Sequence, residues 1–477
     1  MSSERGIVAT GLYVPRQRLS GDEIQAAWGT SAPVDQAAVP TADEDTLTMS
    51  VAAGRKALAN ADLDAAAVSH LAVATTTPPL EEEEFAPRIG AALGTSSELT
   101  TETATQSTAA GAEALLSGAD ADGTALVIVA DAPDGDPAEA GQRLGAGAAA
   151  FVFDEGGDAK VIDSAQRSRD APGIRFREGG SHSVTGLDIT TYERQMIREL
   201  VSAAVEGLSI DHEAVDAVSL YQPTGGLPHR IARSLPYGGG AVGSGIVVDD
   251  IGDAGAATTA IGLLAALAAS EPGSLTVVGF FGSGASAVAL AFESPAELDV
   301  DLDAALAGGE QISYAEALRE RGTIGSAEVA GGGAHVSLPS WQRTLPQRYR
   351  LEAGRCPECG AVAFPPEGAC PDCHERVTFE TESLARTGEI VAVTVIGQGG
   401  APPEFVELQR RDGPFAVAIV EVETTGERDG TARFPVQLTD CDPEDVSVGD
   451  EVAGRFRRIY SVEGVTRYGL KFVPEQR

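Results

Sequence analysis

The stretch STAAGAEALLSGADADGTALVIVADAP, residues 107–133, joins a helix-like run of small side chains to an almost wholly apolar, strand-like run. A second stretch, AATTAIGLLAALAASEPGSLTVVGFFGSG at residues 256–284, repeats this order. In each copy another apolar run ends at a turn upstream of the helix: HLAVATTTPP at 70–79 and AVSLYQP at 217–223. Because order and spacing match, we predict that the first 300 residues are two copies of one α/β unit.

The rest of this region alternates in the same way between apolar runs and Ala-rich amphipathic segments. Runs of buried-strand character predict further strands at 6–15, 148–156, 245–252 and 286–293. Segments with helical periodicity predict helices at 45–61 and 191–208 in addition to the one at 256–270. This alternation predicts a layered α/β architecture with strands buried on both faces.

Composition narrows the class of protein. The chain of 477 residues carries 71 acidic and 34 basic residues, a formal net charge of −37, and only three of the basic residues are lysines. Many carboxylates with little lysine are typical of a protein from a high-salt cytoplasm, where salt screens their repulsion; an ordinary acidic cytosolic protein is the alternative. Neither a signal-like apolar run nor a membrane-length segment is present, since the longest, residues 260–270, is too short.

The last 130 residues contain a metal-binding pattern. Four of the five cysteines form C-x2-C-x10-C-x2-C, namely Cys356, Cys359, Cys370 and Cys373. Two such pairs supply the four thiolates of a closed tetrahedral site, which predicts a structural zinc ion rather than a catalytic one. Iron in a rubredoxin-like site is the minor alternative. A disulfide framework is disfavoured in a reducing compartment.

Five short alternating strands follow the cysteines, at 388–397, 414–423, 431–440, 450–460 and 466–474. Short strands with turn signals between them predict a small all-β barrel, most simply of OB type. We therefore divide the chain into an α/β domain (1–300), a linker with an entry helix (301–345), a zinc ribbon (346–380) and a barrel (381–477).

The C-terminal part resembles the zinc-ribbon/OB-fold domains that accompany thiolase-superfamily enzymes. The resemblance is carried by RYRLEAGRCPECGAVAFPPEGACPDC at 348–373 and by the final YGLKFVP at 468–474. It implies a domain that helps to hold coenzyme A and bridges partner subunits, with a thiolase-family protein as partner. Arg348 and Arg350 are then candidates to bind the CoA phosphates.

The first 300 residues resemble archaeal hydroxymethylglutaryl-CoA synthase. The matching segments include GIVATGLYVPRQRLSGDEIQAAWG at 6–29, LYQPTGGLPHRIARSL at 220–235 and FFGSGASAVAL at 280–290. The resemblance implies a duplicated thiolase-type α-β-α-β-α fold that takes an acyl-CoA thioester. It also implies glycine turns against the acyl group and the oxyanion, which match Gly282-Ser283-Gly284 and residues 145–147.

The catalytic set that the resemblance implies is replaced in this sequence. The family's glutamate corresponds to Thr76 and its nucleophilic cysteine to Thr108, while its histidine and asparagine correspond to Tyr221 and Asp253. No cysteine precedes Cys356. Because a hydroxyl is a weak nucleophile without a strong base beside it, we expect Thr108, with Thr105 and Ser107, to cap the following helix and fill the former nucleophile pocket instead.

Three functional hypotheses follow. The first is a non-catalytic acyl-CoA-binding scaffold, a homodimer or larger assembly that acts with a thiolase in isoprenoid or lipid metabolism. The second is an active hydroxymethylglutaryl-CoA synthase-like acyltransferase that uses other groups, such as His229 or a carboxylate of LEEEEF at 80–85. The third, a nucleic-acid binder, is disfavoured by the acidic charge, since only residues 341–343 and 348–350 suggest a basic surface with aromatic side chains. We expect the dimer to form through the strand at 124–133.

Overall fold

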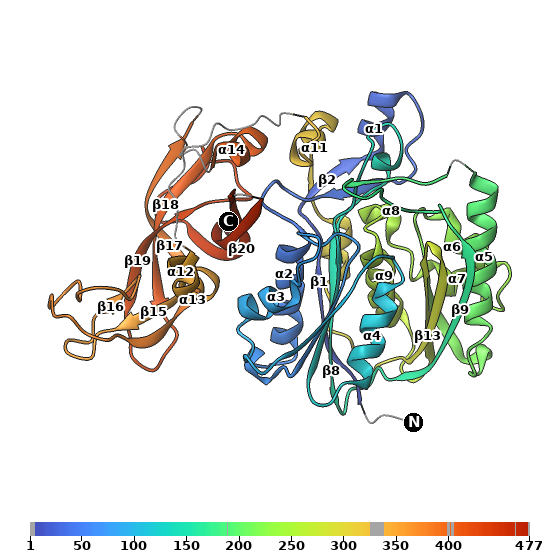
Figure 1. Ribbon diagram of the computed structural model, residues 1–477, viewed down its shortest axis with the longest axis horizontal. Coiled ribbons are helices and arrows are strands. Elements are labelled where there is room, and N and C mark those ends of the chain that lie inside the picture. The colour runs from blue at the N-terminus through green and yellow to red at the C-terminus, as the bar shows by residue number, and fades with distance from the viewer. Residues whose placement is uncertain are drawn as a thin grey trace. The chain divides into compact units, whose positions relative to one another are not determined.

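The computed structural model describes residues 5–187, 189–324, 338–397, 401, 405–462 and 464–475. The chain forms two compact units, Met1–Arg321 and Gly322–Arg477 (Figure 1). Among the described residues, no helix combines the length and apolar character needed to cross a membrane.

The first unit contains most of the regular structure. Its strands are β1 (Arg5–Tyr13), β2 (Gln17–Ser20), β3 (Gln36–Val39), β4 (His70–Ala74), β5 (Thr100–Ala104), β6 (Ala125–Asp131), β7 (Asp134–Gly135), β8 (Gly147–Glu155), β9 (Val161–Ala171), β10 (Ser183–Val184), β11 (Val215–Leu220), β12 (Leu275–Gly282), β13 (Gly284–Glu293) and β14 (Glu310–Gln311). Its α-helices are α1 (Gly21–Trp28), α2 (Thr46–Asn60), α3 (Ala86–Leu93), α4 (Ala110–Asp120), α5 (Thr190–Val205), α6 (Gly226–Ala232), α7 (Gly239–Gly243), α8 (Val248–Ile251), α9 (Ala256–Ala269), α10 (Leu302–Ala307) and α11 (Tyr314–Glu320).

Two sheets of matching topology confirm the predicted duplication. In the first sheet, of order β1-β8-β6-β4-β5, β4 is parallel to β6, and β8 and β1 follow antiparallel. In the second, of order β11-β12-β13-β9, β11 is parallel to β12, and β13 and β9 follow antiparallel. The first copy adds the parallel edge strand β5.

The helices and sheets stack in five layers, as Figure 1 shows from α2 through the first sheet, α4 and α9, and the second sheet to α5. The central helices α4 and α9 belong to one hydrophobic core with strands of both sheets. Helix α9 has twelve buried residues because its small and apolar side chains cover its whole circumference. Burying each of its leucines contributes about 1.5–3 kcal/mol.

The structure corrects two of the strand predictions. Residues 245–252 form no strand; their centre is the short helix α8, because the Gln222 side chain accepts hydrogen bonds from the N–H groups of Val247 and Val248. The expected dimer strand, β6, lies inside its sheet between β4 and β8, where both of its edges are already paired. Strand β5, which pairs with β4, is the edge strand at that end of the sheet. Strand β9 was not foreseen, since it is a largely exposed polar edge strand.

The segment predicted as a linker begins within the first unit. Helices α10 and α11 and strand β14 belong to Met1–Arg321, and β14 pairs in parallel with β2. The Glu320 carboxylate accepts a hydrogen bond from the N–H of Ala42. Residues 325–337 of the predicted linker lie outside the described residues.

The second unit is mostly β-structure. Its elements are α12 (Leu338–Arg343), α13 (Leu345–Arg350), β15 (Glu352–Arg355), β16 (Val362–Ala363), β17 (Glu380–Ile396), α14 (Val406–Asp412), β18 (Phe415–Thr424), β19 (Thr431–Gln437), β20 (Glu451–Val462) and β21 (Val465–Pro474). The sheet runs β16-β15-β17-β18-β19, with β20 and β21 added beside β17. All five predicted strands are present. However, the ladders between described residues do not close a barrel: β19 forms no ladder with β21, and only Leu438, the residue after β19, makes an isolated bridge with Phe472 of β21.

Candidate functional site

A polar cavity of about 190 Å³ lies in the first unit at the ends of strands from both sheets. The turn after β4 supplies Thr76, the turn before α4 supplies Thr108, and the turn after β12 supplies Ser283. The other lining residues are Glu81, Gln106, Ser107, Arg175, Phe176, Arg177, Glu178, Gly179, Ser181 and Val184. The structure thus brings together two of the four substituted catalytic positions.

Asp131, which the sequence analysis did not single out, organises the turn that carries Thr76. Its fully buried carboxylate accepts hydrogen bonds from the N–H of Thr76 at 2.7 Å and from the hydroxyls of Thr75, Thr76 and Thr77 at 2.7–3.1 Å. It also accepts the N–H of Ala256, the first residue of α9, at 2.7 Å. The Thr76 hydroxyl therefore donates to a carboxylate that several other hydrogen bonds hold in place.

The position of Asp131 follows from strand order. Because β4 and β6 are parallel neighbours, their carboxyl ends meet, and Asp131 comes to lie beside the three threonines. A carboxylate is also favoured electrostatically at the N-terminus of α9. Gly255 allows this close approach, since a Cβ there would stand 2.3 Å from the Asp131 carboxylate. An acidic residue that ends a wholly apolar strand was the available signal in the sequence.

Thr108 is bonded across the unit rather than to its own helix. Its buried hydroxyl donates to the carbonyl of Phe281 on β12 at 2.5 Å. Helix α4 begins at Ala110, and its N-cap residue, Ala109, makes no side-chain cap hydrogen bond. The predicted capping role of Thr108 was therefore wrong, because its hydroxyl reaches the neighbouring strand instead. A carbonyl oxygen cannot take a proton from the hydroxyl at neutral pH.

Asp253 is paired with an arginine that lines the cavity. Its carboxylate, 1% exposed, accepts a hydrogen bond from Arg175 at 2.5 Å and lies 3.8 Å from the guanidinium of Arg143. Burial is the largest influence and favours a lower pKa for the Arg175 guanidinium, but the charge of Asp253, its hydrogen bond and the neighbouring Tyr221 and Asp131 together raise that pKa above its ordinary value. Arg175 is therefore charged at neutral pH and forms an ion pair with Asp253. Asp253 itself does not line the cavity.

Tyr221 is a buried side chain behind the cavity. Its ring packs against Phe281 with centroids 5.4 Å apart, and its N–H donates to the carbonyl of Gly279. Burial raises the pKa of the Tyr221 phenol to about 12, although the charge of Arg175 opposes this. Tyr221 is thus neutral at physiological pH, so it does not serve as the base that a histidine supplies.

The remaining predicted positions divide into those at the cavity and those away from it. Ser283 lines the cavity, and its hydroxyl accepts the N–H of Arg175 at 3.0 Å. Its neighbour Gly282 lets the strand end approach Ser107, because an added Cβ would lie 2.4 Å from that hydroxyl oxygen. Glu81 of the acidic run also lines the cavity. His229 is exposed on α6 and is absent from the cavity lining.

The second unit brings its four predicted cysteines together. Their sulfurs all lie within 4.8 Å of one another, with Cys356 and Cys373 at 3.8 Å and Cys359 and Cys370 at 3.6 Å. Four sulfurs bound tetrahedrally at a zinc–sulfur distance of about 2.3 Å stand about 3.8 Å apart. The four cysteines therefore fit a tetrahedral metal ion such as zinc.

Two similar turns hold the cysteines. The carbonyl of Cys356 accepts the N–H of Gly360, and the carbonyl of Cys370 accepts the N–H of His374. Gly360 and His374 both have positive φ, at 79° and 61°, which ends each turn in the same way. Such turns point their two thiols to the same side, so pairing the two turns builds the four-thiol cluster.

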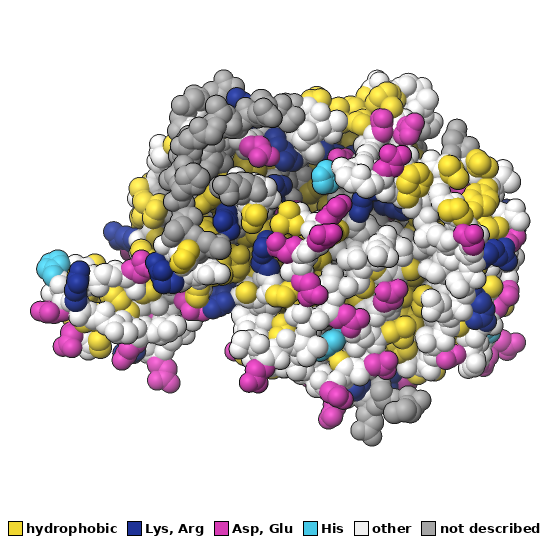
Figure 2. Space-filling model, in the orientation of Figure 1, with side chains coloured by type: hydrophobic (Ala, Val, Ile, Leu, Met, Phe, Trp, Pro, Cys, Tyr) yellow, Lys and Arg dark blue, Asp and Glu magenta, His cyan; other side chains and the backbone are white. Residues whose placement is uncertain are grey.

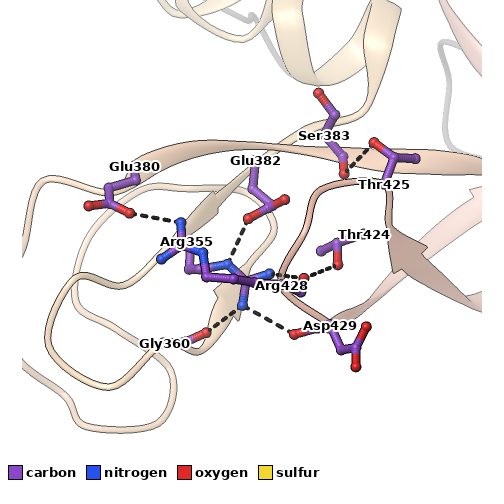
Figure 3. Close-up of polar contacts among 9 residues, drawn as sticks. All are labelled: Arg355, Gly360, Glu380, Glu382, Ser383, Thr424, Thr425, Arg428 and Asp429. Atoms are coloured by element: carbon purple, nitrogen blue, oxygen red, sulfur yellow. Dashed lines mark hydrogen bonds and ion pairs between the residues drawn. The ribbon is translucent and has the colours of Figure 1, made fainter.

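Arg355 ties the first of these turns to the large sheet, as Figure 3 shows. Its side chain, 4% exposed, forms an ion pair with Glu382 of β17 at 2.6 Å. The guanidinium also donates to the carbonyls of Gly360, Arg428 and Asp429, which lie in the cysteine turn and in the β18–β19 connection. Because one planar group makes all four contacts, Arg355 joins ribbon and sheet.

The predicted phosphate-binding arginines have partners within the second unit. Arg350 forms an ion pair with Glu352 at 2.5 Å. Arg348 donates to the Thr344 hydroxyl, and its guanidinium lies 4.4 Å from the ring centroid of Trp341. Arg467 lies 5.0 Å from the same ring, and Trp341 is only 5% exposed. The tryptophan thus packs beneath arginines and is not an open aromatic platform.

Comparison with known proteins identifies the larger part of the chain. It is 32% identical over 311 residues to hydroxymethylglutaryl-CoA synthase from Methanopyrus kandleri, a match that covers 61% of this chain and 88% of that protein. The chain belongs to the hydroxymethylglutaryl-CoA synthase family. A solved structure titled as HMG-CoA synthase complexed with CoA shares the fold, with a TM-score of 0.62 and 15% identity over 71% of this chain and 94% of that chain.

This family member carries an additional module. Residues 343–380 match the family described as ChsH2, rubredoxin-like zinc ribbon domain, and residues 381–457 match the ChsH2, C-terminal OB-fold domain. A DUF35 domain-containing scaffold protein from Methanothermobacter thermautotrophicus is 37% identical over 141 residues, 29% of this chain and 96% of that protein. The fusion of a hydroxymethylglutaryl-CoA synthase-like unit to a ribbon and OB-fold module, expected from the resemblance, is confirmed.

Proposed function

We propose that this protein is a non-catalytic acyl-CoA-binding scaffold. The observation that carries the proposal is the hydrogen bond from the Thr108 hydroxyl to the Phe281 carbonyl, which leaves the hydroxyl at the nucleophile position without a base. The hydroxyl of Thr76 is likewise committed to Asp131, and Tyr221 is held neutral. Acyl transfer needs an activated nucleophile and a group that takes its proton, and these positions supply neither.

The retained parts of the first unit support ligand binding. A synthase-type fold, a polar cavity and a serine turn against that cavity are all present. The solved structure titled as HMG-CoA synthase complexed with CoA supports a ligand that contains CoA. We therefore propose an acyl-CoA thioester as the ligand, with Ser283 and its flanking glycines beside the acyl group.

The second unit supports an assembly role. We propose that Cys356, Cys359, Cys370 and Cys373 hold one structural zinc ion and that Arg348 and Arg350 contribute to binding the CoA phosphates. Its relative from Methanothermobacter is named a scaffold protein, which favours a partner subunit of the thiolase family. The reaction served would belong to isoprenoid or lipid metabolism. In the first unit, edge strand β5 offers free backbone groups for a homodimer.

The acidic composition supports the proposal that this protein works in a cytoplasm of high salt concentration. Figure 2 shows acidic side chains spread over the visible face of the protein, as the formal charge of −37 requires. Salt screens such repulsion, so the midpoint of thermal unfolding should rise between 0.1 and 2 M KCl. A midpoint that is unchanged or falls would contradict this setting.

Binding and turnover measured on the same preparation test the proposal. The protein purified from its native host should bind CoA thioesters by calorimetry and should bring a thiolase-family subunit with it. It should form no hydroxymethylglutaryl-CoA from acetyl-CoA and acetoacetyl-CoA when separated from other enzymes. Turnover that persists at constant specific activity through purification would overturn the proposal.

One observation favours the second candidate, an active acyltransferase. Glu81 lines the cavity that also contains Thr76 and Thr108, which places a carboxylate near the position of the lost glutamate. If Glu81 acts as a base, any acyl-transfer activity should fall by two or more powers of ten in Glu81→Gln. Glu98→Gln, at an exposed position outside the cavity, is the matched control.

A further inference from the structure

Arg175 and Arg177 form a pair of cations at the cavity that the non-catalytic proposal leaves without a task. They belong to a segment that is extended around Phe176, whose N–H and carbonyl both pair with Thr185 at 2.9 Å. Because side chains alternate along an extended chain, residues two apart point to the same side. Both arginines line the cavity, as does Phe176 between them.

The two arginines differ in how their charges are balanced. The charge of Arg175 is offset by Asp253, although its buried Nη2 has no hydrogen-bond partner among the described residues. The Arg177 guanidinium donates a hydrogen bond to the carbonyl of Thr76, and within the described part of the chain it forms no ion pair with a carboxylate. The cavity wall therefore carries one guanidinium that is held in place and forms no ion pair with a described carboxylate.

The surroundings of Arg177 limit the ligand. Neutral donors also line the cavity, among them the side chains of Gln106 and Ser107, and the volume of about 190 Å³ corresponds to roughly six water molecules. Two exposed carboxylates, Glu81 and Glu178, also line the cavity. A ligand with several negative charges would meet their repulsion, whereas a single carboxylate can pair with the guanidinium in a two-pronged hydrogen bond.

We infer that the cavity selects acyl groups that end in a free carboxylate, with Arg177 as the residue that binds this carboxylate and Arg175 as a fixed part of the wall. The inference rests on the proposed function, because it names the acyl class that the scaffold binds. Hydrogen bonds to a charged group of this kind correspond to a roughly ten- to hundredfold difference in affinity.

Two thioesters with acyl chains of four carbons test the inference. Succinyl-CoA, which ends in a carboxylate, should bind the full chain at least tenfold more tightly than butyryl-CoA by calorimetry. In Arg177→Gln this ratio should fall to about one, with butyryl-CoA affinity unchanged. Arg169 lies on β9 and its exposed guanidinium pairs with Glu199 of α5, so Arg169→Gln should keep the ratio.

The possible failures separate the inference from the proposed function. Equal binding of the two thioesters by the unaltered protein would overturn the inference and leave CoA binding intact, and so would a ratio that survives in Arg177→Gln. If neither thioester binds, the proposed function fails. Free succinate then tests the site alone by ligand-observed NMR: binding that Arg177→Gln abolishes supports the carboxylate site, and absence of binding by the unaltered protein overturns it.

Discussion

The four cysteines of the second unit and the cavity of the first differ in how the side chains at their predicted functional positions are bonded. The sulfurs of the four cysteines lie together, and their spacing fits a single metal ion. At the cavity, the hydroxyls of Thr76 and Thr108 are already bonded to protein acceptors. The cysteine centre thus has the groups that its expected metal chemistry needs, whereas the two threonines at the cavity are committed to structural hydrogen bonds.

The difference teaches that a fold and its chemistry are separable. The turns around the cavity are held by Asp131, by the Asp253–Arg175 pair and by glycines that permit close approach. These contacts hold the turns of the site in place. We propose on this basis that the cavity retains a ligand while the reaction is lost.

The largest effect is expected at the cysteine centre. Cys356→Ser or Cys370→Ser should release about one zinc per chain and unfold the ribbon, because the binding free energy of a structural zinc, roughly 10 kcal/mol or more, is also folding free energy. Metal analysis and limited proteolysis measure both outcomes. Cys441→Ser, outside the cluster, should retain the metal. An intact ribbon without metal would contradict the structural role.

Asp131→Asn should weaken the first unit strongly. The amide keeps the shape but loses the charge that five donor groups share, so we expect a loss of roughly 3–5 kcal/mol in the free energy of unfolding. Denaturant unfolding in molar salt measures it. Asp120→Asn, at the exposed end of α4, is the control and should change stability by less than about 0.5 kcal/mol. Equal losses in the free energy of unfolding for the two variants would contradict the role of Asp131 in holding this turn.

Arg355→Lys should separate the ribbon from the sheet at an intermediate cost. Lysine keeps the charge opposite Glu382 but not the planar fork that reaches three carbonyls, so we expect a loss of about 2–3 kcal/mol in the second unit. Amide exchange of the β18–β19 connection should rise. Arg428→Lys, an exposed ion pair in the same region, should have little effect. A stability equal to that of the unaltered chain would show that the joint does not depend on Arg355.

The smallest effect is expected at Thr108. Thr108→Val removes one hydroxyl donor at nearly constant shape, so stability should fall by about 1 kcal/mol and any activity of the native complex should be unchanged. Thr105→Val makes the same change at a partly exposed position without a side-chain hydrogen bond among the described residues. Loss of acyl transfer by several powers of ten in Thr108→Val alone would identify a nucleophile.

The sequence predicted the fold better than the site, for physical reasons. The layered fold was predictable from apolar periodicity and from the repeated order of residues 107–133 and 256–284, because which side chains are buried depends on the local sequence pattern. The cysteine cluster was predictable because its ligand spacing is local. Asp131 and Arg177 were missed because their roles arise from contacts between segments far apart in the chain. The helix at residues 248–251 was mistaken for a strand because the Gln222 side chain overrides a local apolar run.

Intact mass spectrometry tests the central claim, the absence of a working nucleophile in the cavity, most directly. The full-length protein, purified with its native partners and incubated with acetyl-CoA in molar salt, should keep its unmodified mass. Peptide mapping should find no acyl group on Thr105, Ser107 or Thr108. A stable acetyl adduct in this turn would contradict the scaffold account and establish acyl transfer as the function of the cavity.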